Sequence, residues 1–312
     1  MPKPYSLPSY EDVFNLPYEQ LSIDDSLESI RNKDILKYRI KLILAGNTLE
    51  VEAYPIWRES KYKAVRVKTG NETRKAQRDL NHKNVQKHVS RIIHHNFDHT
   101  GIWCTFTYPA GQAPADEKEA QRDIQNYFRN LRRHIKRHGP PCPELKYIYV
   151  TEYVTDETTG RKHAHHHIIM NFNDRDTVES LWKKGGRTQA RRLQPDDFGL
   201  EGLARYISKD ATNTANRKGK KTYATSKNIE KYKEVTSDHR LPCTNYRMSK
   251  KRVAELATNE NTTRALLEEH YKNHKVMDDV IKIKFSRYVS GAYIHAKMMR
   301  KPTRAGTGRR RE

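Results

Sequence analysis

The sequence is poor in long apolar runs and in cysteine. No stretch approaches the apolar length that a membrane-spanning helix needs, and no signal peptide opens the chain, so we expect no membrane insertion. The three cysteines, Cys104, Cys142 and Cys243, are odd in number and far apart, with no Cys-x-x-Cys spacing. This pattern argues against a zinc ribbon or a disulfide framework and favours the reducing cytoplasm.

Acidic residues are also few relative to basic ones. Asp and Glu number 38 against 60 Lys and Arg, which gives a formal net charge of +22 over 312 residues. This excess indicates a polyanionic partner, for which nucleic acid is a stronger candidate than a membrane surface. Only 35% of the residues are hydrophobic, but they cluster between about Val89 and Ile207, where a core can form.

Composition and periodicity divide the chain into three predicted regions. Residues 1–80 are read as a polar, partly acidic arm followed by a β-hairpin, because Tyr38 to Ala53 alternates around the turn signal Gly46-Asn47. Residues 81–235 form the main domain. Residues 236–312 form a helical extension with a basic tail.

The main domain is predicted to mix helices and strands. Helices are expected at 81–96, 116–138, 177–182 and 200–210, and strands at 102–108, 146–154 and through the run HAHHHIIMNF. The extension is expected to hold helices at 249–257 and 263–274 and a strand at 281–285. Because the turn before the histidine run is short, the two strands that it joins must be antiparallel. We therefore predict an α+β fold with a largely antiparallel sheet and helices on one face.

Two histidines in the run HAHHHIIMNF share one face of the predicted strand. Side chains alternate along a strand, so His165 and His167 point to one side and His166 packs on the other. On the preceding strand, Glu152 falls opposite His165 if the turn centres near Thr158-Thr159. Opposite residues of an antiparallel pair lie close enough to bind one ion.

Two imidazoles and one carboxylate form a mixed nitrogen and oxygen site. We expect His165, His167 and Glu152 to bind Mg²⁺ or Mn²⁺, whose other positions water and phosphate oxygens can fill. Zinc accepts the same ligand types. His163 has the same parity and is the reserve ligand if the register slips. The alternative interpretation is a structural histidine cluster, which is the more common role of histidines on strands.

Tyr206 and Lys209 form a second candidate group, within the run GLEGLARYISKD. Apolar residues at helical spacing give this run a buried stripe, and residues three apart are neighbours on a helix surface. A free phenol titrates at about 10, so it needs help to act as a nucleophile at neutral pH. A metal ion and an adjacent ammonium would both favour the phenolate. Tyr223 and Tyr232 are the fallback nucleophiles.

Basic residues gather on the helix at 116–138 and in a later segment. The helix has an apolar seam with a basic flank, for which phosphate contact and a solvated charged face are about equally supported. The candidate phosphate-binding cations are Arg129, Arg132, Arg133, Lys136 and Arg137 on the helix, and Arg187, Arg191 and Arg192 further along.

These motifs, in this order, resemble the single-tyrosine HUH endonucleases, specifically the rolling-circle replication initiators of Gram-positive plasmids, phages or integrative elements. Cys104-Thr-Phe-Thr-Tyr108 is similar to the family's first motif, Glu152 with HHHIIMN to its metal motif, and Tyr206-Ile-Ser-Lys209 to its tyrosine motif. The tyrosine follows the histidines, as it does in replication initiators. The resemblance covers roughly residues 81–229, and no Walker A pattern indicates a fused helicase.

The resemblance implies a ferredoxin-like or RRM-like core with a metal on one face of the sheet. It also implies metal-dependent nicking and rejoining of single-stranded or hairpin origin DNA. Tyr206 would form a 5′-phosphotyrosine and release a 3′-OH for a host polymerase, with unwinding supplied by a host helicase. Lys209 would stabilise charge on the phosphate, and Thr105 and Thr107 would lie near the DNA.

Two other classes of function fit the same residues. One is a non-catalytic nucleic-acid-binding protein, in which Tyr206→Phe changes nothing. The other is a metal-dependent nuclease that activates water, in which cleavage survives Tyr206→Phe but not the loss of His165 and His167. Within the family, a relaxase or a transposase is the closest rival.

Overall fold

The chain divides into two compact units in a computed structural model. The structure describes residues 33, 35–57, 71–138, 144–155, 160, 162–209, 223–278, 280–285 and 290–302, without the side chains of 71–82 and of Lys209. The central unit is Asn81–Tyr232, and the flanking unit joins Met1–Leu80 to Lys233–Glu312. The predicted N-terminal arm and the basic tail lie outside the described residues.

The central unit contains the predicted helices and strands together with two short strands that were not predicted. In chain order its elements are α3 (Asn71–Asn96, which enters the unit at Asn81), β3 (Ile102–Thr107), α4 (Glu117–His138), β4 (Tyr147–Thr155), β5 (Lys162–Met170), α5 (Arg175–Ser180), β6 (Thr188–Arg192), α6 (Glu201–Lys209) and β7 (Ala224–Thr225). The predicted bounds agree within a few residues, except that α3 begins ten residues earlier than residue 81.

The central sheet has the ferredoxin-like βαββαβ arrangement. The elements β3, α4, β4, β5, α5 and β6 follow one another along the chain. Across the sheet the strand order is β6-β3-β5-β4-β7, and every neighbouring pair is antiparallel. The predicted α+β class, the antiparallel sheet and the ferredoxin-like core are therefore confirmed.

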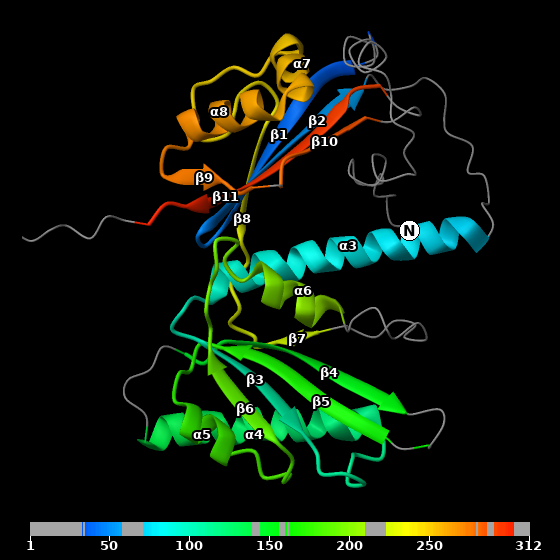
Figure 1. Ribbon diagram of the computed structural model, residues 1–312, viewed down its shortest axis with the longest axis vertical. Coiled ribbons are helices and arrows are strands. Elements are labelled where there is room, and N and C mark those ends of the chain that lie inside the picture. The colour runs from blue at the N-terminus through cyan, green and yellow to red at the C-terminus, as the bar shows by residue number, and fades with distance from the viewer. Residues whose placement is uncertain are drawn as a thin grey trace, which may run out of the picture. The chain divides into compact units, whose positions relative to one another are not determined.

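The helices cover both faces of this sheet, whereas one face was predicted. In Figure 1, α4 and α5 lie below the sheet, and α6 and α3 lie above it. On the α4 side, Phe106 and Phe128 are part of the main core, and Phe128 stacks on Tyr147 with ring centroids 3.5 Å apart. On the other side, Ile148 and Ile169 are also fully buried. Strands with apolar residues on both faces must be packed against other elements on both faces. The number of predicted helices did not indicate how they divide between the two faces.

The flanking unit joins the predicted hairpin to the C-terminal segment in one sheet. Its elements are β1 (Ile35–Ala45), β2 (Thr48–Trp57), β8 (Lys233–Ser237), α7 (Lys250–Thr258), α8 (Glu260–His270), β9 (His274–Val276), β10 (Lys282–Phe285) and β11 (Ala292–Arg300). The hairpin β1–β2 turns at Gly46, as predicted. The strand order is β10-β11-β2-β1-β8, with β9 beside β11. Alternate residues of β2 and β11, such as Val51 and Ala296, pack in its core with α7 and α8.

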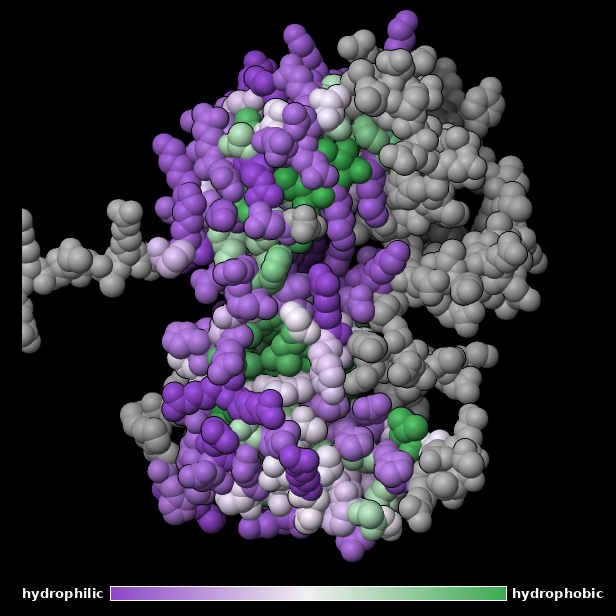
Figure 2. All heavy atoms as spheres, in the orientation of Figure 1, coloured by the Kyte–Doolittle hydropathy of each residue, from purple (hydrophilic) through white to green (hydrophobic). Residues whose placement is uncertain are grey.

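Hydrophilic side chains cover most of the described surface on the side drawn in Figure 2, as the high charge implies. Within the described residues, no helix is both long and apolar enough to cross a membrane.

Two glycines of the central unit give a matched test of packing. A Cβ on Gly186 would lie 1.9 Å from the Thr107 carbonyl oxygen, whereas a Cβ on Gly202 in α6 would meet nothing within 4 Å. Gly186→Ala should therefore destabilise the protein by about 1–3 kcal/mol. Gly202→Ala should be neutral or stabilising by up to about 1 kcal/mol, because alanine favours helix. Thermal unfolding of the two variants measures the difference, and equal melting temperatures would contradict this packing.

Candidate active site

Strand β5 presents His165 and His167 to the sheet face on which α6 lies. His166 points to the opposite face, where it is completely buried. There its Nδ1 lies 2.9 Å from the Thr151 hydroxyl and its Nε2 lies 3.0 Å from the Tyr108 hydroxyl. Burial lowers the pKa of His166 to about 3, so this imidazole is neutral and structural, as predicted.

The predicted strand register is present. Glu152 on β4 lies directly opposite His165, and Thr105 on β3 lies opposite His167. The Nε2 atom of His167 is 3.7 Å from a carboxylate oxygen of Glu152, and its Nδ1 is 3.3 Å from the Thr105 hydroxyl. Burial lowers the pKa of His167, although the Glu152 carboxylate opposes this shift. An imidazole oriented through Nδ1 directs its Nε2, here beside the Glu152 carboxylate, to the position from which it would bind a metal.

The three predicted ligands are not yet gathered around one point. Within the described parts of the chain, the one group of three metal-ligating side chains whose donor atoms all lie within 4.8 Å of one another is Glu50, Glu52 and His295, in the flanking unit. Glu152 already lies beside His167, whereas the rings of His165 and His167 have centroids 6.5 Å apart. Two imidazoles and a carboxylate are donor types that a divalent ion accepts, so the chemistry of these residues fits such an ion.

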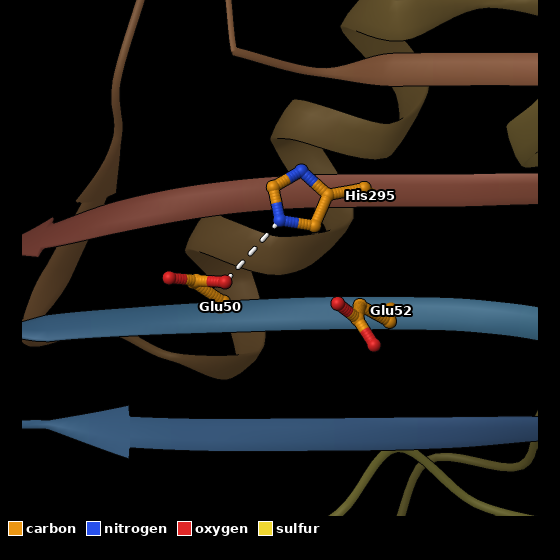
Figure 3. Close-up of side chains that lie close together, drawn as sticks. All are labelled: Glu50, Glu52 and His295. Atoms are coloured by element: carbon orange, nitrogen blue, oxygen red, sulfur yellow. Dashed lines mark hydrogen bonds and ion pairs between the residues drawn. The ribbon is translucent and has the colours of Figure 1, made fainter. Parts of the chain in front are cut away.

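The cluster in the flanking unit has a simpler explanation than metal binding. Figure 3 shows Glu50 and Glu52 side by side on β2, facing His295 on β11. His295 Nε2 is 3.4 Å from a Glu50 oxygen, and the Lys297 ammonium is 4.0 Å from the other. The Lys297 ammonium on the neighbouring strand helps to account for the burial of the Glu50 carboxylate. The pair Glu50 and Glu52 was not predicted as a site from the sequence.

Tyr206 lies beside the histidine pair. Its ring meets the ring of His167 edge-on, with centroids 5.2 Å apart, and meets Trp103 in the same way at 5.6 Å. Trp103 in turn stacks on His167 at 5.4 Å with an angle of 4°. Tyr206 is 48% exposed, so a substrate can reach it. Lys209 belongs to the same helix, but its side chain lies outside the described residues.

The fallback tyrosines are in other surroundings. Burial raises the pKa of Tyr223, and Tyr232 is 7% exposed with its hydroxyl 3.0 Å from His88 Nδ1. Neither residue lines the cavity that contains the histidine pair. A raised pKa makes Tyr223 a poor nucleophile at neutral pH, and burial keeps Tyr232 from a substrate.

A cavity of about 380 Å³ brings the candidate residues together, and it is called the catalytic cavity because the candidate catalytic residues line it. It is lined by Thr105, Thr107, Glu152, His165, His167, Arg187, Gln189 and Tyr206. The predicted ligands, the predicted nucleophile, both threonines and one predicted arginine thus share one space. Gln189 was missed, because the short strand β6 carries no apolar alternation in its sequence TQARR.

The other predicted cations are divided between the two faces. Arg191 lines a neighbouring hollow on the Tyr206 side, whereas Arg192, next along β6, has the opposite parity. Helix α4 packs on the face opposite the catalytic cavity through Ile124 and Phe128. Its five candidate cations, Arg129, Arg132, Arg133, Lys136 and Arg137, are exposed there. Arg132 hydrogen bonds to the Tyr147 hydroxyl at 3.1 Å.

The arginine pair on β6 tests which face binds single-stranded DNA. Arg191→Gln should weaken the affinity for a single-stranded oligonucleotide and reduce the slope of log K against log salt by about 0.7, because one phosphate contact is lost. Arg192→Gln changes the same charge on the other face and should have little effect. Fluorescence anisotropy at several salt concentrations measures both, and equal losses would argue against binding at the Tyr206 face.

Comparison with known proteins gives a match to a family model. Residues 101–215 match the family model described as replication-associated protein ORF2/G2P. No match was found among curated proteins or among solved structures. The matched segment begins just before β3, extends past α6, and contains Glu152, His165, His167 and Tyr206. It supports a replication-initiator family for this part of the chain.

Proposed function

We propose that this protein is a rolling-circle replication initiator of the single-tyrosine HUH type, which nicks and rejoins single-stranded origin DNA through Tyr206. One observation carries the proposal. Tyr206 contacts His167 in a cavity that also contains His165 and Glu152, all within the segment that matches replication-associated proteins. An exposed tyrosine beside two histidines and a carboxylate suits phosphoryl transfer better than a structural role.

The reaction exchanges one phosphate ester for another. The Tyr206 oxygen attacks the scissile phosphorus, a bond from phosphorus to the phenol oxygen forms, and the bond to the 3′ oxygen breaks. One proton passes, in net terms, from the phenol to the leaving oxygen, which becomes a free 3′-OH. Arg187 in the cavity and Arg191 beside it would hold the flanking phosphates. Reversal with a new 3′-OH rejoins the strand.

His165, His167 and Glu152 would hold a Mg²⁺ or Mn²⁺ ion, which when bound would supply positive charge at the scissile phosphate. The protein prepares this site through the Thr105 hydroxyl, which is within hydrogen-bonding distance of His167, and through burial, which keeps that imidazole neutral. From its sequence spacing, Lys209 would be a second positive charge near Tyr206.

The released 3′-OH would be extended by a host DNA polymerase, and a host helicase would open the duplex. Both partners imply that the protein acts in the cytoplasm on a plasmid, a phage or an integrative element. Cutting at a transfer origin or an element end would instead indicate a relaxase or a transposase.

The nucleophile can be tested with a matched pair of tyrosines. Wild type incubated with single-stranded fragments of its own replicon and Mn²⁺ should give a covalent protein–DNA band on a denaturing gel. Tyr206→Phe should abolish this band, because among the described residues no other phenol lines the cavity. Tyr223→Phe should leave the band unchanged. Cleavage that persists without a band would indicate a nuclease that activates water.

The metal ligands can be tested with two histidines of equal parity. His165→Ala should reduce adduct formation at least about 100-fold, since it removes a ligand. His163→Ala should retain near wild-type activity, because His163 pairs with Val154 and not with Glu152. EDTA should abolish the wild-type reaction, and added Mn²⁺ should restore it. Full activity of His165→Ala, or of wild type in EDTA, would contradict the proposed site.

A further inference from the structure

A second hollow adjoins the catalytic cavity on the same sheet face. It has a volume of about 280 Å³ and is lined by Trp103, Thr105, Gln189, Arg191, Leu203 and Tyr206. Thr105, Gln189 and Tyr206 line both spaces. A group bound in the hollow is therefore separated from the catalytic cavity by only the width of a side chain.

The pairing of β3 with β6 sets the positions of four side chains that line this hollow. Thr105 pairs with Gln189, and Trp103 pairs with Arg191, across β3 and β6. Successive pairs on one face stand two residues apart along the strands, so an indole, an amide and a guanidinium are presented together. Leu203 from α6 adds an apolar side.

The chemistry of this lining matches a nucleobase. An aromatic ring offers a stacking surface for an unpaired base, and an amide and a guanidinium offer donors and an acceptor to its edge. Sites for drug-sized ligands occupy about 300–1,000 Å³, so a hollow slightly below this range suits one base and not a folded strand. Glutamine pairs favourably with adenine and arginine with guanine, which are both purines.

Gln189 has no evident structural task that would explain its position. Its side chain is half-buried, yet among the described residues its amide makes no hydrogen bond. Within the same part of the chain, Arg191 forms no ion pair. A half-buried amide that the fold does not use is available to a ligand.

We propose that this hollow binds one unpaired purine base of a nucleotide that flanks the scissile phosphate, with Gln189 reading the base edge. The inference rests on the proposed function and adds a residue that determines sequence preference at the cut. Trp103 supplies the stacking surface, and Arg191 contacts the base or its phosphate.

The test begins from the cut that wild type makes in single-stranded fragments of its replicon. Three nucleotides on each side of that cut are randomised, and the covalently trapped and released strands are sequenced. Wild type should enrich purines over pyrimidines about fivefold or more at one position. Gln189→Leu should reduce this enrichment to near one among the strands that it cuts. Thr188→Val, a neighbour on the opposite face of β6, should preserve it.

A second measurement needs no variant. An abasic nucleotide at the enriched position should slow adduct formation by wild type about fivefold or more, because stacking and edge contacts are lost together. The same lesion three nucleotides farther away should not slow it. Adducts without purine enrichment, or enrichment that survives Gln189→Leu, would overturn this inference alone. The absence of any adduct would overturn the proposed function and this inference with it.

Discussion

The direction in which β5 faces is the constraint on which the candidate site depends. His166, fully buried between the hydroxyls of Thr151 and Tyr108, anchors one face of this strand. A slip of one residue would turn His165 and His167 toward the α4 face and His166 toward the α6 face, so the whole donor set would change faces. The buried hydrogen bonds of His166 make such a slip costly, since its partners would lose their contacts as well. His166, which has no proposed chemical role, thus determines the sheet face to which His165 and His167 point.

From this fixed face, three neighbouring elements complete the site. β4 contributes Glu152, β3 contributes Thr105 and Trp103, and α6 brings Tyr206 against His167. The rings of Trp103, His167 and Tyr206 contact one another, so the metal-ligand candidate and the nucleophile candidate are positioned by the same packing. The proposed base-binding hollow uses the other side of this group. Cutting and sequence preference would then depend on one aromatic cluster.

Contacts between segments close in the sequence could be predicted from the sequence, whereas contacts between distant segments could not. The hairpin of β4 and β5 could be paired because its turn is short, so Glu152 could be predicted opposite His165. The sheet face that α4 covers could not be predicted, because helical spacing does not indicate on which face a helix between two strands packs. Gln189 was missed because TQARR lacks the apolar alternation that marks a strand. β11 pairs with β2 across more than 200 residues, and no local pattern predicts such a pairing.

The most direct test of this account identifies the atom that carries the DNA. The trapped adduct would be digested with nuclease and trypsin and sequenced by mass spectrometry. Since Arg205 precedes Tyr206 and Lys209 follows Ser208, trypsin releases the nucleophile candidate within a four-residue peptide, Tyr206–Lys209. We expect the residual nucleotide on that peptide, joined to the phenol through a 5′ phosphate. A nucleotide on Tyr223 or Tyr232, or a phosphate attached through its 3′ side, would contradict the proposed chemistry.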